Sequence, residues 1–234
     1  MKQNQTLLIY GVFSLFYILS IFFKITFATE TLNVLFIPLA FCLYIQEVRK
    51  INNVMLVIFL ILFVNNAEVL FFQPNSFWSI FIYLITKCIF YLVLTVIAFK
   101  RITDFSIRRM LFSAVPIILL WLIYFNYSIK DLFGKEMSDM YIYYLVYSIL
   151  LSSFLLISLI SYFSKETLNG IHLIVIATCF MISGILRAIQ VFLVNVSYFD
   201  MVVAFLYIVC YFFIFKFATT YTQLHTQNQA ILSK

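Results

Sequence analysis

The chain has 234 residues, of which 65% are apolar and only 10% are charged, and its formal net charge is +6. Soluble domains average about 45–50% apolar and about 25% charged residues, so a water-soluble fold could not bury this much apolar surface. The composition therefore excludes a soluble protein and predicts an integral membrane protein. The basic residues flank apolar segments and form no separate patch, which argues against nucleic acid as a partner.

Apolar segments of roughly 20 residues, the length that crosses a bilayer, follow one another along the chain. Their continuous apolar character favours helices over a barrel. The second segment is short and contains Pro38, which predicts a kink or a tilt. We predict an all-α fold, a polytopic transmembrane helix bundle that forms one domain over residues 1–219, with a polar tail at 220–234. Its eight predicted spanning helices are 6–27, 31–47, 53–72, 77–99, 109–127, 141–163, 170–194 and 199–219.

Positive charge is distributed unevenly between the two sides that eight spans define. The opposite loops hold few basic residues, and nearby acidic residues dilute them. The positive-inside rule then predicts that both termini are cytoplasmic. The side that carries the termini collects Lys2, Arg49, Lys50, Lys100, Arg101, Arg108, Arg109, Lys165, Lys216 and Lys234.

Ionisable residues inside the predicted spans are the main functional signal. Each costs about 2.5–3.5 kcal/mol near the bilayer centre on insertion scales, so such residues usually face the bundle interior. In "LFVNNAEVLFF" (62–72), Glu68 lies in the third span, with Asn65 one turn earlier on the same face. In "CFMISGILRAIQVF" (179–192), Arg187 forms a polar stripe with Ser183 and Gln190.

Two further spans carry polar or aromatic candidates. Lys87 lies in the middle of the fourth span, with Tyr91 at i+4. Tyr143 and Tyr147 share one face at the start of the sixth span. Lys216 lies close to the cytoplasmic end of the last span, which predicts a headgroup anchor. We include Tyr91 and Tyr143 with the candidate ligand-binding residues.

Two interpretations of Glu68 and Arg187 remain open at this stage. Either the two side chains form a structural ion pair that joins the third span to the seventh, or both line a polar pocket for a ligand. Lys87 is an alternative partner for Glu68. The only histidines, His172 and His225, lie far apart, and the sequence contains no zinc motif and no Gly-rich phosphate loop. We therefore predict no metal and no cofactor.

Short motifs in this arrangement resemble those of the YhhN-like family. "AEVLFF" (67–72) matches the G-D-hydrophobic-L motif of the third span, with Ala67 for Gly and Glu68 for Asp. "FMISGILRA" (180–188) is similar to a seventh-span signature, with Gly184 where the family has Asp. "CIFY" (88–91) retains the Tyr of a fourth-span motif but has Cys for its His, and the family's Lys-Pro near the second span lacks its Pro here.

The resemblance implies an eight-span bundle and a lysoplasmalogenase-type activity, the hydrolysis of a vinyl-ether lysolipid by a pair of acidic residues. Glu68 would be one acid or base, and Gly184 leaves the second position without a carboxylate. We expect a lysolipid-like ligand among membrane lipids, in a bacterial cytoplasmic (inner) membrane. The alternative is a non-catalytic scaffold or accessory subunit in which Glu68 and Arg187 form a structural ion pair. A small transporter is a third hypothesis, but the chain shows no internal repeat.

Overall fold

The computed structural model describes residues 2–48, 50–72, 76–102, 141–164, 166–192 and 197–232, with isolated positions between 116 and 127. These residues form seven helices, numbered with a gap at α5. The all-α prediction is confirmed for this part of the chain, and the predicted span at 109–127 lies for the most part outside it. The helices are α1 (Lys2–Phe22), α2 (Thr26–Glu47), α3 (Asn53–Phe71), α4 (Phe77–Lys100), α6 (Tyr141–Ser164), α7 (Leu168–Phe192) and α8 (Ser197–Leu232).

Six of the described helices are long and apolar enough to cross a membrane, and α1 has a shorter apolar stretch, Leu7–Phe22. This apolar helical bundle is that of a multi-pass integral membrane protein. The observed bounds differ from the predicted ones by a few residues except in α8, which continues as helix to Leu232 and takes in most of the predicted tail. Pro38 lies inside α2.

Capping residues explain where several of the helices begin and end. The Asn52 side chain accepts a hydrogen bond from the Val54 amide at 2.9 Å at the start of α3. Ser76 does the same for the Ser79 amide, at 3.2 Å, at the start of α4. After α1 the chain turns at Lys24, which adopts a positive φ of 56°.

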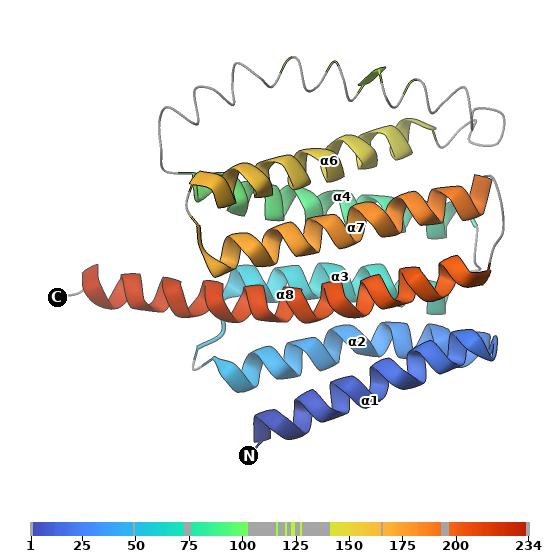
Figure 1. The fold of residues 1–234 in the computed structure, drawn as a ribbon, viewed down its shortest axis with the longest axis horizontal. Coiled ribbons are helices and arrows are strands. Elements are labelled where there is room, and N and C mark those ends of the chain that lie inside the picture. Colours follow the sequence, from blue (N-terminus) through green and yellow to red (C-terminus); the bar gives the residue numbers. More distant parts are fainter. Residues whose placement is uncertain are drawn as a thin grey trace.

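The helices run side by side along one long axis (Figure 1). Both chain termini lie at one end of the bundle, called here the termini end. The opposite end, where α7 finishes and α8 begins, is called the distal end. Helix α8 packs against α1, α2 and α7, while α4 packs against α3, α6 and α7. In the most apolar stretch of α8, 50% of the residues are buried, whereas in that of α6 only 22% are buried. Helix α8 is therefore the central helix of the described bundle.

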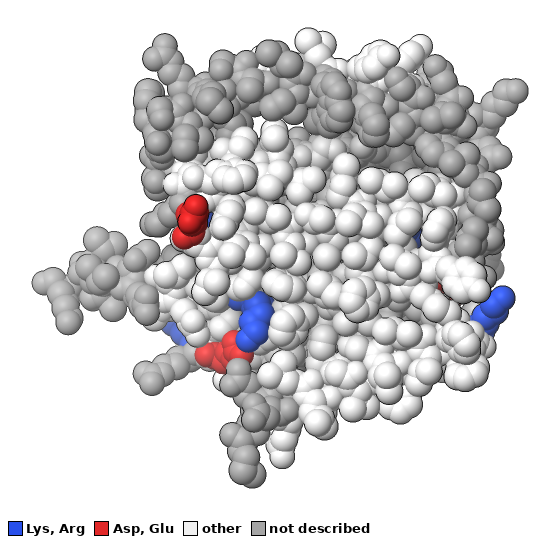
Figure 2. All heavy atoms as spheres, in the orientation of Figure 1, with Lys and Arg blue, Asp and Glu red and all other residues white. Residues whose placement is uncertain are grey.

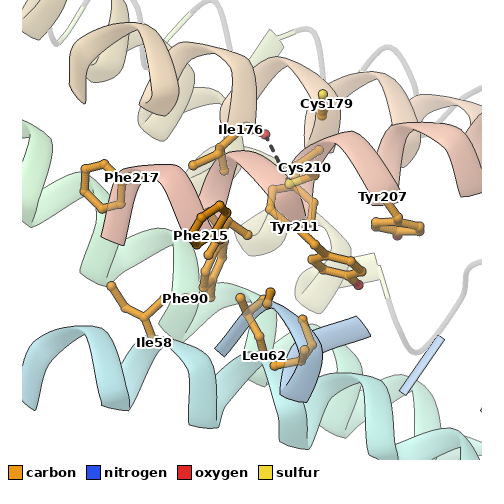
Figure 3. Packing of buried hydrophobic residues seen from close by; sticks show 14 of the residues in the cluster. Ile58, Leu62, Phe90, Ile176, Cys179, Tyr207, Cys210, Tyr211, Phe215 and Phe217 are labelled. Atoms are coloured by element: carbon orange, nitrogen blue, oxygen red, sulfur yellow. Dashed lines mark hydrogen bonds between the residues drawn. The ribbon is translucent and has the colours of Figure 1, made fainter. Parts of the chain in front are cut away.

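Charged side chains are sparse on the face that Figure 2 shows, and they gather toward its two ends. A broad uncharged band lies between them, as expected for a surface that contacts acyl chains. Large apolar side chains are exposed on the described part of the molecule, Phe71 and Phe163 among them at 79% and 74% exposure. The interior is also apolar: Leu62 of α3, Phe90 of α4 and Phe215 of α8 belong to one buried cluster (Figure 3).

Candidate functional site

Lys87 is the most deeply buried charged side chain among the described residues, with 1% of its surface exposed. Its amine lies 4.1 Å from the centre of the Phe180 ring, and 5.4 and 5.7 Å from those of Tyr207 and Tyr83. These are cation–π distances, but no described group accepts a hydrogen bond from Lys87 Nζ. The sequence drew attention to Lys87, because a lysine in the middle of a span can reach neither headgroups nor water.

Tyrosines from three helices form two hydroxyl pairs, one of which consists of the two tyrosines whose rings contact this lysine. The hydroxyls of Tyr83 in α4 and Tyr207 in α8 lie 3.4 Å apart, and those of Tyr91 in α4 and Tyr147 in α6 lie 3.5 Å apart. Tyr91 and Tyr207 belong to the buried core. We call the group formed by Lys87, Arg187, Ser183 and the tyrosines at 83, 91, 147 and 207 the Lys87 cluster.

Arg187 adds a second cation to the Lys87 cluster. Its charge acts on Lys87 and on the phenols of Tyr83 and Tyr207, so it lies in their electrostatic neighbourhood. Unlike Lys87, Arg187 is exposed. The cluster therefore has a buried cation, Lys87, and an accessible one, Arg187, on facing helices.

No described carboxylate forms a salt bridge with either of these cations, because the one salt bridge within the described residues joins Lys216 to Glu47. Asp200 is the nearest acidic influence on Arg187. Its carboxylate accepts a hydrogen bond from the Gln190 side chain at 2.9 Å. Gln190, predicted as part of the polar stripe, thus joins α7 to α8 at the distal end.

The ion pair that the sequence left open for Glu68 is absent among the described residues. Glu68 forms no salt bridge with Arg187 or Lys87, both of which are described, and instead its carboxylate accepts a hydrogen bond from the Ser79 hydroxyl at 2.9 Å. Ser79 precedes Lys87 by eight residues, or roughly 12 Å along α4. The sequence could not choose a partner for Glu68, because span depth places a residue along the membrane normal but not around the helix axis.

Asn65 shows how α3 lies against α4 at this depth. It is buried, and its amide donates to the Tyr83 carbonyl at 3.2 Å and to the Thr86 hydroxyl at 2.7 Å. Asn65 therefore supports the backbone of the helix that carries Lys87 and donates to Tyr83 only through its main-chain carbonyl. Asn65 and Glu68 form successive contacts of α3 along α4.

Ser183 and Gly184 position α7 beside the cluster. Ser183 is buried, and its hydroxyl donates to the Phe180 carbonyl at 3.0 Å. A β-carbon on Gly184 would lie 3.2 Å from the Tyr147 hydroxyl, so the absence of a side chain at this position allows Tyr147 to approach α7. Tyr143, predicted as a ligand-binding residue with Tyr147, lies outside the cluster: it is 38% exposed and packs edge-on against Phe81.

Sequence reasoning missed two tyrosines of α8. Tyr207 and Tyr211 stack with ring centres 5.9 Å apart (Figure 3). Tyr211 bonds to the side chain of Asn66, whose amide donates to its hydroxyl at 2.8 Å. A signal was present, because Tyr207 and Tyr211 are spaced i, i+4 deep inside a span, away from the interfacial positions that tyrosine favours.

Comparison of the chain with known protein families, with curated proteins and with solved structures found no match. The geometry defines the class of protein: a multi-pass helical membrane protein with a cationic, phenol-lined cluster inside it. Two cations that form no salt bridge with a described carboxylate suit an anion, and aromatic rings suit apolar or cationic groups.

Proposed function

We propose that the protein binds an anionic amphiphile within the bilayer, with its headgroup anion held by Lys87 and Arg187. One observation carries the proposal: the buried Lys87 amine has no hydrogen-bond acceptor among the described residues. Buried polar groups normally have partners, and a buried charge is costly without one. A phosphate or carboxylate oxygen would supply the acceptor, and the accessible Arg187 would offer a bidentate donor to the same anion.

The resemblance to the YhhN-like family suggests the kind of amphiphile, a lysolipid with a single chain. It also suggests an eight-span bundle in a bacterial cytoplasmic membrane with both termini in the cytoplasm. On that orientation, the Lys87 cluster lies in the half of the membrane remote from the cytoplasm, and the lipid enters sideways between helices.

Binding is tested with purified protein in detergent, by native mass spectrometry with 1-acyl-lysophosphatidate and with monoacylglycerol of the same chain length. We expect tighter binding of the phosphate-bearing lipid. Loss of a charged hydrogen bond is worth about 1.5–3 kcal/mol, so Lys87→Met should weaken binding by about tenfold or more. Lys216→Met is the matched control, since Lys216 is also an intramembrane lysine but pairs with Glu47.

Equal binding of the two lipids, or unchanged lysophosphatidate binding by Lys87→Met, would refute the proposal. An equal loss of affinity in Lys216→Met would also count against it, because that result would point to a general effect of membrane charge.

Hydrolysis of a vinyl-ether lysolipid is a second candidate function. Its specific support is Glu68, a partly buried carboxylate that accepts a hydrogen bond from Ser79. A protonated Glu68 would donate to the vinyl-ether β-carbon, and water would attack the resulting oxocarbenium ion. Purified protein should then release aldehyde from lysoplasmenyl lipid, and Glu68→Gln should abolish the release. No release by the unaltered protein, with lysophosphatidate still bound, would leave binding as the function.

A non-catalytic accessory role is the remaining alternative, and the three cation–π contacts of Lys87 favour it. If these contacts exist only to hold helices together, Lys87→Met will lower the thermal midpoint of the ligand-free protein. Under the binding proposal the same substitution raises it, because it removes an uncompensated buried charge.

A further inference from the structure

Buried polar atoms without partners are concentrated in one part of the molecule. Seven such side-chain atoms occur within the described residues, and six belong to α4, α6 and α7. Besides Lys87 Nζ, they are the hydroxyl oxygens of Thr95, Ser158, Ser161 and Ser164 and Nδ1 of His172. We call these five residues the polar seam.

The hydroxyls of the polar seam differ from most others in this protein. Serine and threonine in a membrane helix commonly donate to a carbonyl three or four residues earlier. Thr86, Ser183 and Thr219 do so here, at 2.7, 3.0 and 3.0 Å. Ser158 and Ser161 make no such bond although both are completely buried. Their hydroxyls therefore need a partner that the described helices do not supply.

Two close contacts fix the register of α6 against α7. A β-carbon on Gly184 would meet Tyr147, and one on Gly170 would lie 3.3 Å from Cα of Tyr162. The helices are antiparallel, so Ser161 lies level with residues 170–172, which include His172. Ser158, Ser161 and Ser164 then follow one another at steps of about 4.5 Å toward the termini end.

At the termini end, the polar seam opens onto further polar groups. The guanidinium of Arg101, just after α4, donates to the hydroxyl of Thr167, just before α7. The Thr220 hydroxyl donates to the side chain of Asn169. The first contact therefore joins the termini ends of α4 and α7, and the second joins α7 to α8 at the same end of the bundle.

Aromatic rings close the other end of the seam. Tyr91 lies one turn from Thr95 and one turn from Lys87, so it separates the two along α4. Its ring stacks on Phe154 at 6.1 Å and lies 5.5 Å from Phe180, which also contacts Phe90 at 5.5 Å. All four side chains are at most 1% exposed. We call these four residues the aromatic layer.

We infer that a file of bound water occupies the polar seam from the termini end as far as Thr95 and Ser158, and that the aromatic layer separates it from Lys87. Buried water binds where two to four otherwise unpaired polar groups converge, and the hydroxyls of α4 and α6 with the imidazole of α7 supply them. The file gives water from one side of the membrane access to within two helical turns of Lys87 itself. The presence of water in the polar seam does not depend on whether the Lys87 cluster binds an amphiphile.

Silver ions, which are small enough for a narrow file of water and react with thiols, test this inference. All four native cysteines are replaced by alanine, and Ser164→Cys, Ser161→Cys, Ser158→Cys or Lys87→Cys is added singly. Each variant in phosphatidylcholine nanodiscs is exposed to Ag⁺, and the thiols that remain are counted with a maleimide after unfolding. A variant that retains Cys210 alone is the control, because that thiol is fully buried between α7 and α8, near the Ile176 carbonyl.

We expect the rate at which Ag⁺ reacts with the introduced thiol to fall from position 164 to 161 to 158. Each of these rates should exceed that of Cys210 by more than about tenfold, because an ion and a thiolate both require water. Lys87→Cys should react as slowly as Cys210. Rates at 158 and 161 equal to that of Cys210, or the reverse order, would overturn the water file. A fast reaction at position 87 would overturn the barrier.

A second measurement does not depend on cysteine. Ser161→Ala removes a hydroxyl that is satisfied if water is bound and unsatisfied if the seam is dry. We expect the thermal midpoint to stay unchanged or to fall. A higher midpoint would contradict the inference.

Discussion

Two lysines lie inside membrane helices at opposite halves of the bundle, and their surroundings differ. Lys216, toward the termini end, keeps 32% of its side chain exposed, and its amine lies 3.3 Å from the Glu47 carboxylate and 4.7 Å from the Phe215 ring. Lys87, on the distal side of the aromatic layer, is 1% exposed and lies among aromatic rings, and no described residue accepts a hydrogen bond from its amine. Lys216, predicted as a headgroup anchor, thus forms an ion pair with Glu47. The Lys87 amine has no such partner among the described residues, and a bound anion would supply one.

The comparison teaches that intramembrane charge is not a functional signal in itself. Lys216 and Glu47 neutralise each other at a partly exposed position, which requires no ligand. A fully buried amine without an acceptor carries a penalty that the fold alone does not remove. What distinguishes the two lysines is the presence of a partner, and the predictions below test that difference.

The largest effect is expected where the aromatic layer separates the two halves. Phe154→Ala removes a fully buried ring that stacks on Tyr91. Large-to-small changes of this kind cost about 3–5 kcal/mol, so the free energy of unfolding in detergent should fall by that amount. Phe163→Ala is the control, since Phe163 lies on the same helix at 74% exposure and should change stability little. Equal effects at both positions would mean that the aromatic layer is not packed as described.

Lys87→Met should raise the free energy of unfolding of the ligand-free protein by about 1–3 kcal/mol, since an unsatisfied buried group costs that much or more. Chemical unfolding in detergent measures the change. A loss of stability would place Lys87 in the same class as Lys216 and remove the basis for a ligand.

Gly184→Ala tests how closely α7 approaches the Lys87 cluster. The new methyl group would lie 3.2 Å from the Tyr147 hydroxyl, so that side chain must move. We expect a loss of about 1 kcal/mol, the lower end for overpacking. Tyr147→Phe removes the hydroxyl, so the double variant should recover most of the loss. Additive losses would show that the strain lies elsewhere.

Lys216→Met should have the smallest effect, a loss of less than about 1 kcal/mol, because partly exposed ion pairs contribute little. Glu47→Gln should produce a similar loss, and the double variant should lose no more than either. Thermal unfolding of the three variants measures this coupling, and losses that simply add would argue against the ion pair.

Glu68 and Arg187 illustrate the limit of span-by-span reasoning. Both are ionisable, and both lie inside long apolar helices of the described structure, α3 and α7. Their pairing depends on the rotation of α3 and α7 and on which helices lie between them. In the structure α3 packs against α4, so Glu68 meets Ser79, while Arg187 shares a neighbourhood with tyrosines of α4 and α8.

Composition and the spacing of polar breaks were sufficient to predict a membrane protein, a helical architecture and the approximate bounds of most described helices. These properties follow from the transfer of short apolar segments into hydrocarbon, which depends on local sequence. Local sequence could not predict three features: the grouping of Lys87 with Tyr147 and Tyr207, the separation of Glu68 from both cations of the cluster, and the polar seam of α4, α6 and α7. Lipid and protein interior are equally apolar, so the sequence pattern does not reveal which side of a membrane helix faces its neighbours, and close packing between helices settles it.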